Sequence, residues 1–116
     1  MAVTQNTSIN LVVDQGADFS NNLTVTTDGS TAYDISGLTF RAQMRPSYES
    51  STLTAEFTTA IVTATSGIYK LSLTDVQTKA ISSGRYVYDV LMTLADSTIE
   101  VVHKGILTVN PRVTQL

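Results

Sequence analysis

Residues 84–94 read Gly84-Arg-Tyr-Val-Tyr-Asp-Val-Leu-Met-Thr-Leu94, and this stretch indicates the fold class more clearly than any other. Every second position carries a large apolar or aromatic side chain, so an extended chain presents one apolar face. The positions on that face are Tyr86, Tyr88, Val90, Met92 and Leu94. Thr74 and Gln77 lie upstream with the spacing of a helix capping box, and a second apolar-rich run follows at 98–109. We therefore predict a hairpin whose strands belong to a buried core.

Short strand-like runs recur along the rest of the chain, with turn residues between them. Residues 38–45 alternate most regularly, and Pro46 ends this run because proline cannot donate to a strand ladder. Gly105 interrupts the last run, where we predict a β-bulge. The other predicted strands are residues 8–13, 17–27, 53–57, 61–64 and 68–73, and the predicted turns include Asp28-Gly29 and residues 34–37.

One short helical connection is expected between the strands. Thr74 is a suitable N-cap with Gln77 at the capping-box position, and Gly84 closes the segment. Long helices between strands are missing, which excludes parallel βαβ units. The predicted fold is an all-β, immunoglobulin-like antiparallel sandwich of seven to eight strands with a helical turn near residues 75–81. We divide the chain into an N-terminal arm (1–7), the sandwich (8–111) and a C-terminal tail (112–116).

Composition narrows the class of protein. The chain has 116 residues, enough for one domain, and charged residues make up only 15% of it. The net charge of −3 argues against a nucleic-acid partner, which requires a basic patch. The sequence begins without the basic and apolar segments of a signal peptide and contains no run of membrane-spanning length, so no membrane association is expected.

Residues able to carry out chemistry are few. His103 is the only histidine and lies in a strand-like run, so we interpret it as a structural histidine and predict that the protein is not an enzyme. The chain has no cysteine, which excludes thiolate zinc sites. The pairs Asp14 and Asp18, and Asp28 and Asp34, lack the spacing of a calcium loop and are expected to stabilise turns. No catalytic residue, cofactor or metal is predicted.

The tyrosines divide into structural and surface candidates. Tyr86 and Tyr88 lie at core positions, and Tyr86 follows a turn in the manner of a tyrosine corner, whose hydroxyl binds nearby backbone. Thr74 and Gly84 are also predicted to be structural, because they begin and close the expected helical segment. Tyr33 and Tyr48 lie in predicted loops, where an exposed ring can anchor an interface or stack on a sugar. The interface candidates are Val3, Thr4, Asn6, Tyr33, Tyr48 and Arg112.

Several segments together resemble a known class of protein. They are residues 33–45, which begin Tyr33-Asp-Ile-Ser-Gly, Gly67-Ile-Tyr-Lys-Leu-Ser-Leu-Thr, Gly84-Arg-Tyr-Val-Tyr-Asp-Val and the closing Lys104-Gly-Ile-Leu-Thr-Val-Asn-Pro-Arg-Val-Thr114. Over residues 8–114 the chain resembles small immunoglobulin-like structural proteins of tailed bacteriophages, of the cyanophage type, and is similar to the N-terminal domain of baseplate upper proteins. The resemblance implies a virion building block and carries no catalytic residues over.

The predicted function is therefore non-enzymatic assembly in a phage virion, in the tail, baseplate or neck region. Two alternatives remain: a capsid decoration (cement) protein, and a module that binds a carbohydrate or the host surface. The expected partners are copies of the chain itself and other virion proteins, with a host glycan as the partner in the last alternative. The expected location is the virion, after synthesis in the host cytoplasm.

Overall fold

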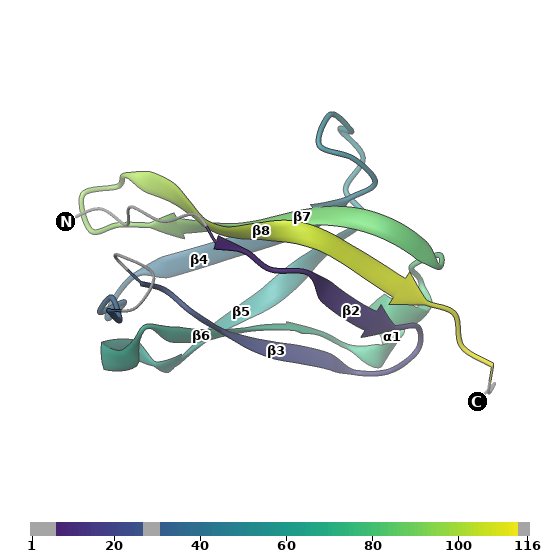
Figure 1. Ribbon diagram of the computed structural model, residues 1–116, viewed down its shortest axis with the longest axis horizontal. Helices are drawn as coiled ribbons and strands as arrows, with labels where there is room; N and C mark the ends of the chain where they lie inside the picture. The colour runs from purple at the N-terminus through teal and green to yellow at the C-terminus, as the bar shows by residue number, and fades with distance from the viewer. Residues whose placement is uncertain (1–6, 27–30, 114–116) are drawn as a thin grey trace.

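The computed structural model describes residues 7–26 and 31–113 and has an all-β architecture (Figure 1). The strands are β1 (Thr7–Ser8), β2 (Leu11–Asp14), β3 (Phe19–Thr24), β4 (Thr39–Arg45), β5 (Ala55–Thr63), β6 (Ile68–Leu73), β7 (Gly84–Thr93) and β8 (Ile99–Asn110). The 3-10 turn η1 (Ala64–Ser66) precedes β6, and the short helix α1 (Asp75–Lys79) precedes β7. The helical turn expected near residues 75–81 is thus present and ends at Lys79.

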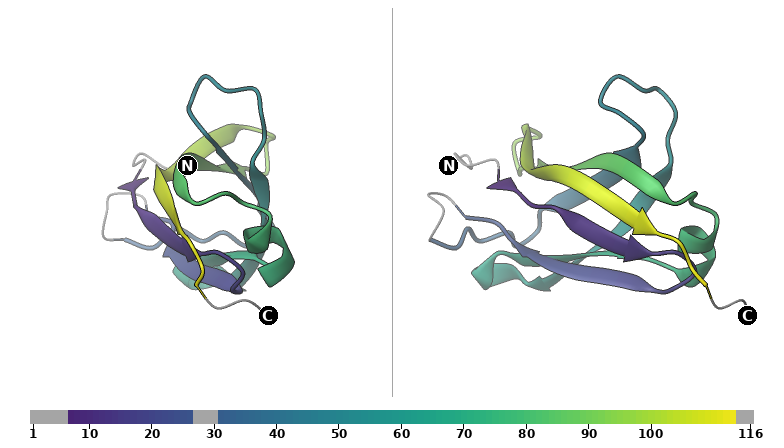
Figure 2. Two further views of the ribbon diagram at one scale, coloured as in Figure 1. Left: turned by 90° about the vertical axis from the view of Figure 1, so that its right-hand side faces the viewer. Right: turned by 45° about the vertical axis from the view of Figure 1, so that its right-hand side comes forward.

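The strands form one hydrogen-bonded path in the order β1-β8-β7-β4-β5-β6-β3, and β2 also pairs with β8. In Figure 1, β8, β7 and β4 make the upper layer, while β6 and β3 make the lower one. Strand β5 joins the layers, because residues 55–57 pair with β4 and residues 58–63 pair with β6. Figure 2 shows β2 between β8 and β3, so the two layers approach a closed barrel.

The sheet is mixed, which corrects the expectation of a purely antiparallel sandwich. Strands β1 and β2 both run parallel to β8, with Thr7 opposite His103 and Leu11 opposite Leu107. The N-terminal and C-terminal strands of the described chain therefore lie side by side. A parallel pair of this kind has no local turn to mark it, so the sequence pattern does not reveal its direction.

The core lies between the two layers and follows the predicted alternation. Tyr88, Val90 and Met92 on β7 are buried, and Tyr86 and Leu94 pack partly against them. On β6 the buried residues are Tyr69, Leu71 and Leu73. Burying a side chain of this size is worth roughly 1.5–3 kcal/mol, so these two strands supply a large share of the hydrophobic stabilisation.

Two predicted strand boundaries were wrong. Residues 53–57 and 61–64 were expected as separate strands, but β5 is one continuous strand from Ala55 to Thr63. Thr58, Thr59 and Ala60 join the two parts, because threonine suits a pleated strand and these residues pair with β6. The first strand, expected at 8–13, is instead interrupted between Ser8 and Leu11.

Gly105 accounts for the interruption of the first strand between Ser8 and Leu11. The β-bulge predicted at Gly105 itself was wrong. Gly105 pairs regularly with Tyr88, and the irregularity in the β7–β8 register lies between Val90 and Leu91 instead. The carbonyl group of Ile9 lies against Gly105, where any Cβ atom would overlap it. The Tyr88 hydroxyl donates a 2.5 Å hydrogen bond to the same carbonyl oxygen. Gly105 thus gives the N-terminal segment room to run close beside β8 between β1 and β2.

Helix α1 closes one end of the sandwich through the buried Thr78. The Thr78 hydroxyl donates to the carbonyl oxygen of Ala17 at 2.8 Å and accepts from the Gly16 N–H at 3.0 Å. The Gln15 amide donates to the Ile81 carbonyl oxygen at 2.8 Å. The capping box of α1 is formed by Thr74 and Gln77. These contacts fix the β2–β3 turn against the helix.

Candidate functional site

His103 is part of the core. Its side chain is 2% exposed, and its Nε2 atom lies 3.1 Å from the Thr24 carbonyl oxygen. A carbonyl oxygen can only accept, so Nε2 carries the proton and Nδ1 accepts a 2.5 Å hydrogen bond from the Tyr69 hydroxyl. Burial lowers the pKa of His103 to about 4 and raises the pKa of Tyr69. The imidazole is therefore neutral near pH 7, and both of its nitrogens are occupied by structural hydrogen bonds.

The acidic residues considered as cation ligands accept hydrogen bonds from nearby backbone and side-chain groups instead. The Asp34 carboxylate accepts hydrogen bonds from the Ser36 N–H and hydroxyl, and these bonds lower the pKa of Asp34. The Asp18 carboxylate accepts from the Asp75 N–H at 2.8 Å. Asp14 is 3.4 Å from the Asn110 amide. Each aspartate thus serves a turn, a helix start or a strand end, while Asp28 lies outside the described residues.

The structure places the described interface candidates in different environments. Tyr33 is half-buried and packs against the core, and its N–H donates to the Val25 carbonyl oxygen. The Arg112 side chain lies over Gly16, and its N–H donates to the Gln15 side chain at 3.4 Å. Val3, Thr4 and Asn6 lie outside the described residues. Tyr48 is 69% exposed, so it is the candidate with a freely accessible ring.

The residues predicted to be structural surround the start of β7. The Tyr86 hydroxyl donates to the Ser82 carbonyl oxygen at 2.7 Å, which is the geometry of a tyrosine corner. Gly84 has a φ of 146°, a backbone conformation that favours glycine. Tyr88 is buried against Phe57, and burial raises its pKa to about 12. These groups hold the turn between α1 and β7 and the adjoining hairpin.

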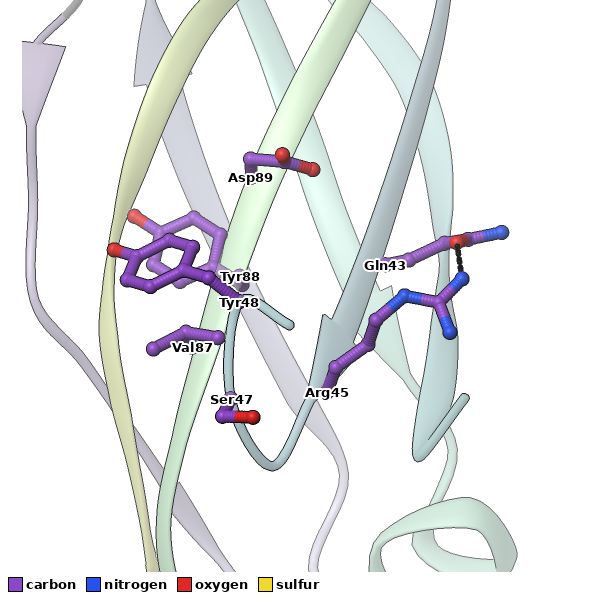
Figure 3. Close-up of a pocket in the computed structure, with 7 residues that line it drawn as sticks. All are labelled: Gln43, Arg45, Ser47, Tyr48, Val87, Tyr88 and Asp89. Atoms are coloured by element: carbon purple, nitrogen blue, oxygen red, sulfur yellow. Dashed lines mark hydrogen bonds between the residues drawn. The ribbon is translucent and has the colours of Figure 1, made fainter. Parts of the chain in front are cut away.

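Tyr48 lies on the loop between β4 and β5, which projects from the body of the molecule at the top of Figure 1. A small pocket of about 110 Å³ lies beside it. Figure 3 shows the Tyr48 ring reaching across β7 next to Val87, with Asp89 further along the same strand. The other lining residues are Gln43, Arg45, Ser47 and Tyr88.

A chain of polar contacts fixes the base of this loop. The Arg45 guanidinium donates to the Ser51 carbonyl oxygen at 2.9 Å and to the Gln43 side chain at 2.8 Å (Figure 3). Gln43 donates to Glu56, which also pairs with Arg41 at 2.9 Å. The Arg41 and Gln43 contacts lower the pKa of Glu56. The loop is thus attached to the sheet at its base, while Tyr48 stays exposed.

Apolar side chains continue from Tyr48 across the outer face of the sheet. Val87 pairs with Ile106 in the β7–β8 register, and Ile106 is 39% exposed. Val12, on β2, is 58% exposed and pairs with Thr108, two residues from Ile106 on β8. We call Val12, Tyr48, Val87 and Ile106 the outer-face patch.

Charged groups border the outer-face patch. Asp89 pairs with Lys104 across β7 and β8, and neither side chain makes a hydrogen bond or ion pair with any residue in the described part of the chain. An apolar centre with an exposed tyrosine and a charged border is typical of a protein–protein interface. The surface is also chemically compatible with a sugar, because an aromatic ring lies beside a carboxylate.

Sequence reasoning found Tyr48 but missed its neighbours. Val87 and Ile106 occupy the outward positions of the β7–β8 hairpin, which an antiparallel sheet facing water normally fills with polar residues. The apolar character of Val87 and Ile106 at these outward positions is the sequence feature that could have identified them. Their proximity to Tyr48 depends on how the loop folds back over the sheet, which periodicity does not show.

Comparison of the sequence with protein-family models and with curated proteins found no match. No helix within residues 7–26 and 31–113 is long and apolar enough to cross a membrane.

Proposed function

We propose that this chain is a non-enzymatic structural protein of a tailed-phage virion that acts by assembling with other proteins through the outer-face patch. The observation that carries the proposal is the exposed Tyr48 ring beside Val87 and Ile106, bordered by Asp89 and Lys104. Tyrosine in such a setting is a frequent hot spot, because its large ring loses little conformational entropy on binding. The virion assignment itself rests on the sequence resemblance.

The state of His103 supports the non-enzymatic part of the proposal. A general base needs a nitrogen that reaches a substrate, and both nitrogens of this buried imidazole already have partners. The small pocket beside Tyr48 lies at the surface, whereas His103 is buried in the core. Binding through the surface is therefore the better supported activity.

Within the virion, we propose the tail, baseplate or neck region, with capsid decoration as the alternative. The assembly role is tested by supplying phage with Tyr48→Ala in place of the native chain and measuring its incorporation into purified particles. The expected result is reduced incorporation, while Val76→Ala, a change of an exposed residue on α1, leaves incorporation unchanged. Equal incorporation of both variants would contradict an assembly role for the patch.

A second candidate is binding of a host carbohydrate at the same surface. The exposed Tyr48 ring next to the Asp89 carboxylate, which has no partner among the described residues, favours it, because sugars stack on aromatic rings and donate hydroxyl hydrogen bonds to carboxylates. A glycan array tests this candidate. Binding that is lost in Tyr48→Ala and weakened in Asp89→Asn would support it, and an array without any bound glycan would exclude it.

A further inference from the structure

Strands β4 and β5 separate after a short paired section and leave a slot between them. Ala42 pairs with Phe57, but residues 58–63 of β5 turn to β6, while residues 39–41 of β4 continue along β7. Figure 1 shows this oblique course of β5 between the layers. Within the described residues, each strand therefore has a partner on one side only along these sections.

The walls of the slot are uncharged and combine apolar side chains with two threonines. A cavity of about 240 Å³ is lined by Leu38, Thr39, Phe40, Thr59, Ala60 and Ile61. The half-buried Phe40 ring stacks on Tyr69 with 4.3 Å between ring centroids, and Ile61 is 40% exposed. The Thr59 hydroxyl donates to the Phe40 carbonyl oxygen at 3.1 Å, replacing a strand–strand hydrogen bond that β5 no longer provides.

The β5 edge lacks the charged and proline residues that usually protect a free strand. Residues 58–61 read Thr58-Thr-Ala-Ile61, and the register irregularity lies beyond them, between Ile61 and Thr63. Soluble proteins usually place lysine or proline on such an edge to prevent pairing with other chains. An edge with free backbone groups and adjacent apolar pockets is the arrangement that accepts an additional strand.

We propose that this slot binds the N-terminal segment of a second copy, residues 1–6, as an added strand along β5. The inference rests on the proposed assembly role and names one of its contacts. Residues 1–6, Met1-Ala-Val-Thr-Gln-Asn6, carry no charged side chain, which suits an uncharged slot, and Val3 supplies an apolar side chain for Phe40 and Ile61. The other end of the chain fits less well, because Pro111 lacks an N–H and Arg112 is held over Gly16.

Sheet order favours a second copy over the molecule's own arm. Strand β1 is separated from β4 by β8 and β7, so its own slot lies three strand spacings away. At about 4.8 Å a spacing this is roughly 14 Å, whereas six extended residues reach only about 20 Å. Crossing the sheet would consume most of residues 1–6 and leave too few of these six to pair with β5.

Disulfide trapping tests the contact directly, because the native chain contains no cysteine to give background cross-links. One chain carries Val3→Cys and a second, of different mass, carries Ile61→Cys; the two are mixed and oxidised with diamide. A disulfide requires Cβ atoms within about 4.5 Å, so cross-links report close approach. The control chain carries Val76→Cys, on α1 away from the slot and 73% exposed.

We expect the Val3–Ile61 mixed dimer to form at least about tenfold faster than the Val3–Val76 dimer. A predominant Ile61–Ile61 dimer would overturn the proposal in favour of direct β5–β5 pairing. A Val3–Ile61 rate equal to that of the control would overturn docking in the slot altogether. Either result leaves the test of Tyr48→Ala in particles unaffected, so failure of this contact is distinguishable from failure of the assembly role.

Discussion

The Tyr69 hydroxyl donates a hydrogen bond to Nδ1 of His103 across 2.5 Å in the centre of the core. Tyr69 comes from β6 and His103 from β8, so this bond links the two layers of the sandwich. Nε2 of the same ring donates to the carbonyl oxygen of Thr24, the last residue of β3. A neutral histidine thus connects three strands through polar contacts inside a largely apolar core.

Replacing Tyr69 with phenylalanine should destabilise the protein without changing its fold. The substitution leaves Nδ1 of His103 buried without a donor, and a buried unsatisfied group costs about 1–3 kcal/mol. Urea denaturation measures the change in the free energy of unfolding. Tyr48→Phe is the control, since the exposed Tyr48 hydroxyl has no hydrogen-bond partner among the described residues. Equal stabilities of the two variants would contradict the assigned role of Tyr69.

The stability of the protein should fall as the pH decreases from about 6.5 to about 4. Burial lowers the pKa of His103 from 6.5 to about 4, so the unfolded chain binds a proton in this range and the folded chain does not. The full difference corresponds to roughly 3 kcal/mol at about 1.4 kcal/mol for each pKa unit. His103 is the only histidine, so its NMR signal can be assigned without ambiguity. A folded protein whose imidazole titrates near pH 6.5 would refute this prediction.

Three tyrosine-to-phenylalanine changes should rank in a definite order. Tyr88→Phe should cost the most, about 1–3 kcal/mol, because it removes the only side-chain donor that the Ile9 carbonyl oxygen has among the described residues. Tyr86→Phe should cost about 1 kcal/mol, since its bond to Ser82 lies closer to solvent. Tyr48→Phe should be nearly neutral. Thermal and urea denaturation of the three variants would establish the order, and a Tyr86 effect above that of Tyr88 would contradict it.

Gly105→Ala should loosen the N-terminal strand. The new Cβ would overlap the Ile9 carbonyl oxygen, and overpacking of this kind typically costs about 1–3 kcal/mol. Hydrogen exchange should show lost protection at residues 11–14 of β2, with little change in β6. Gly37→Ala serves as a comparison, because its Cβ meets no atom within 4 Å and only its positive φ opposes substitution. Unchanged protection in β2 would show that Gly105 is not needed for the pairing of the N-terminal segment with β8.

Thr78→Val should destabilise the end of the sandwich that carries α1. Valine has a similar shape but cannot replace the hydroxyl that bonds to Ala17 and Gly16, and we expect a loss of about 1–3 kcal/mol. Thr78→Ser keeps the hydroxyl and should retain most of the stability. If Thr78→Ser and Thr78→Val lowered the stability equally, the hydrogen bonds of the Thr78 hydroxyl would not be what holds α1 against the β2–β3 turn.

Local patterns in the sequence predict much of the fold. The alternation of residues 84–94 and 68–73 identifies two core strands, and the spacing of Thr74 and Gln77 identifies the helix start, because these signals depend only on neighbouring residues. The parallel pairing of β2 with β8 and the close approach of Ile9 to Gly105 join residues almost a full chain length apart. No short-range pattern specifies such pairs.

The candidate site was also only partly predictable from neighbouring residues in the sequence. Tyr48 was identifiable because an aromatic residue in a polar loop has no core position to fill. The outer-face patch and the slot between β4 and β5 depend on tertiary arrangement: the first on a loop folding over β7, the second on β5 changing layers. Sequence periodicity assigns a residue to a face but does not tell which other segments reach that face.

The central claim, that this chain is an assembled component of a phage virion, is tested most directly by its copy number in purified particles. Quantitative mass spectrometry would compare the chain with the major capsid protein, in particles of a phage whose genome encodes it. A fixed ratio is expected, with a few to a dozen copies for a tail, baseplate or neck position and hundreds for a capsid decoration. Absence of the chain from intact particles, with the protein left in the soluble lysate, would contradict the claim.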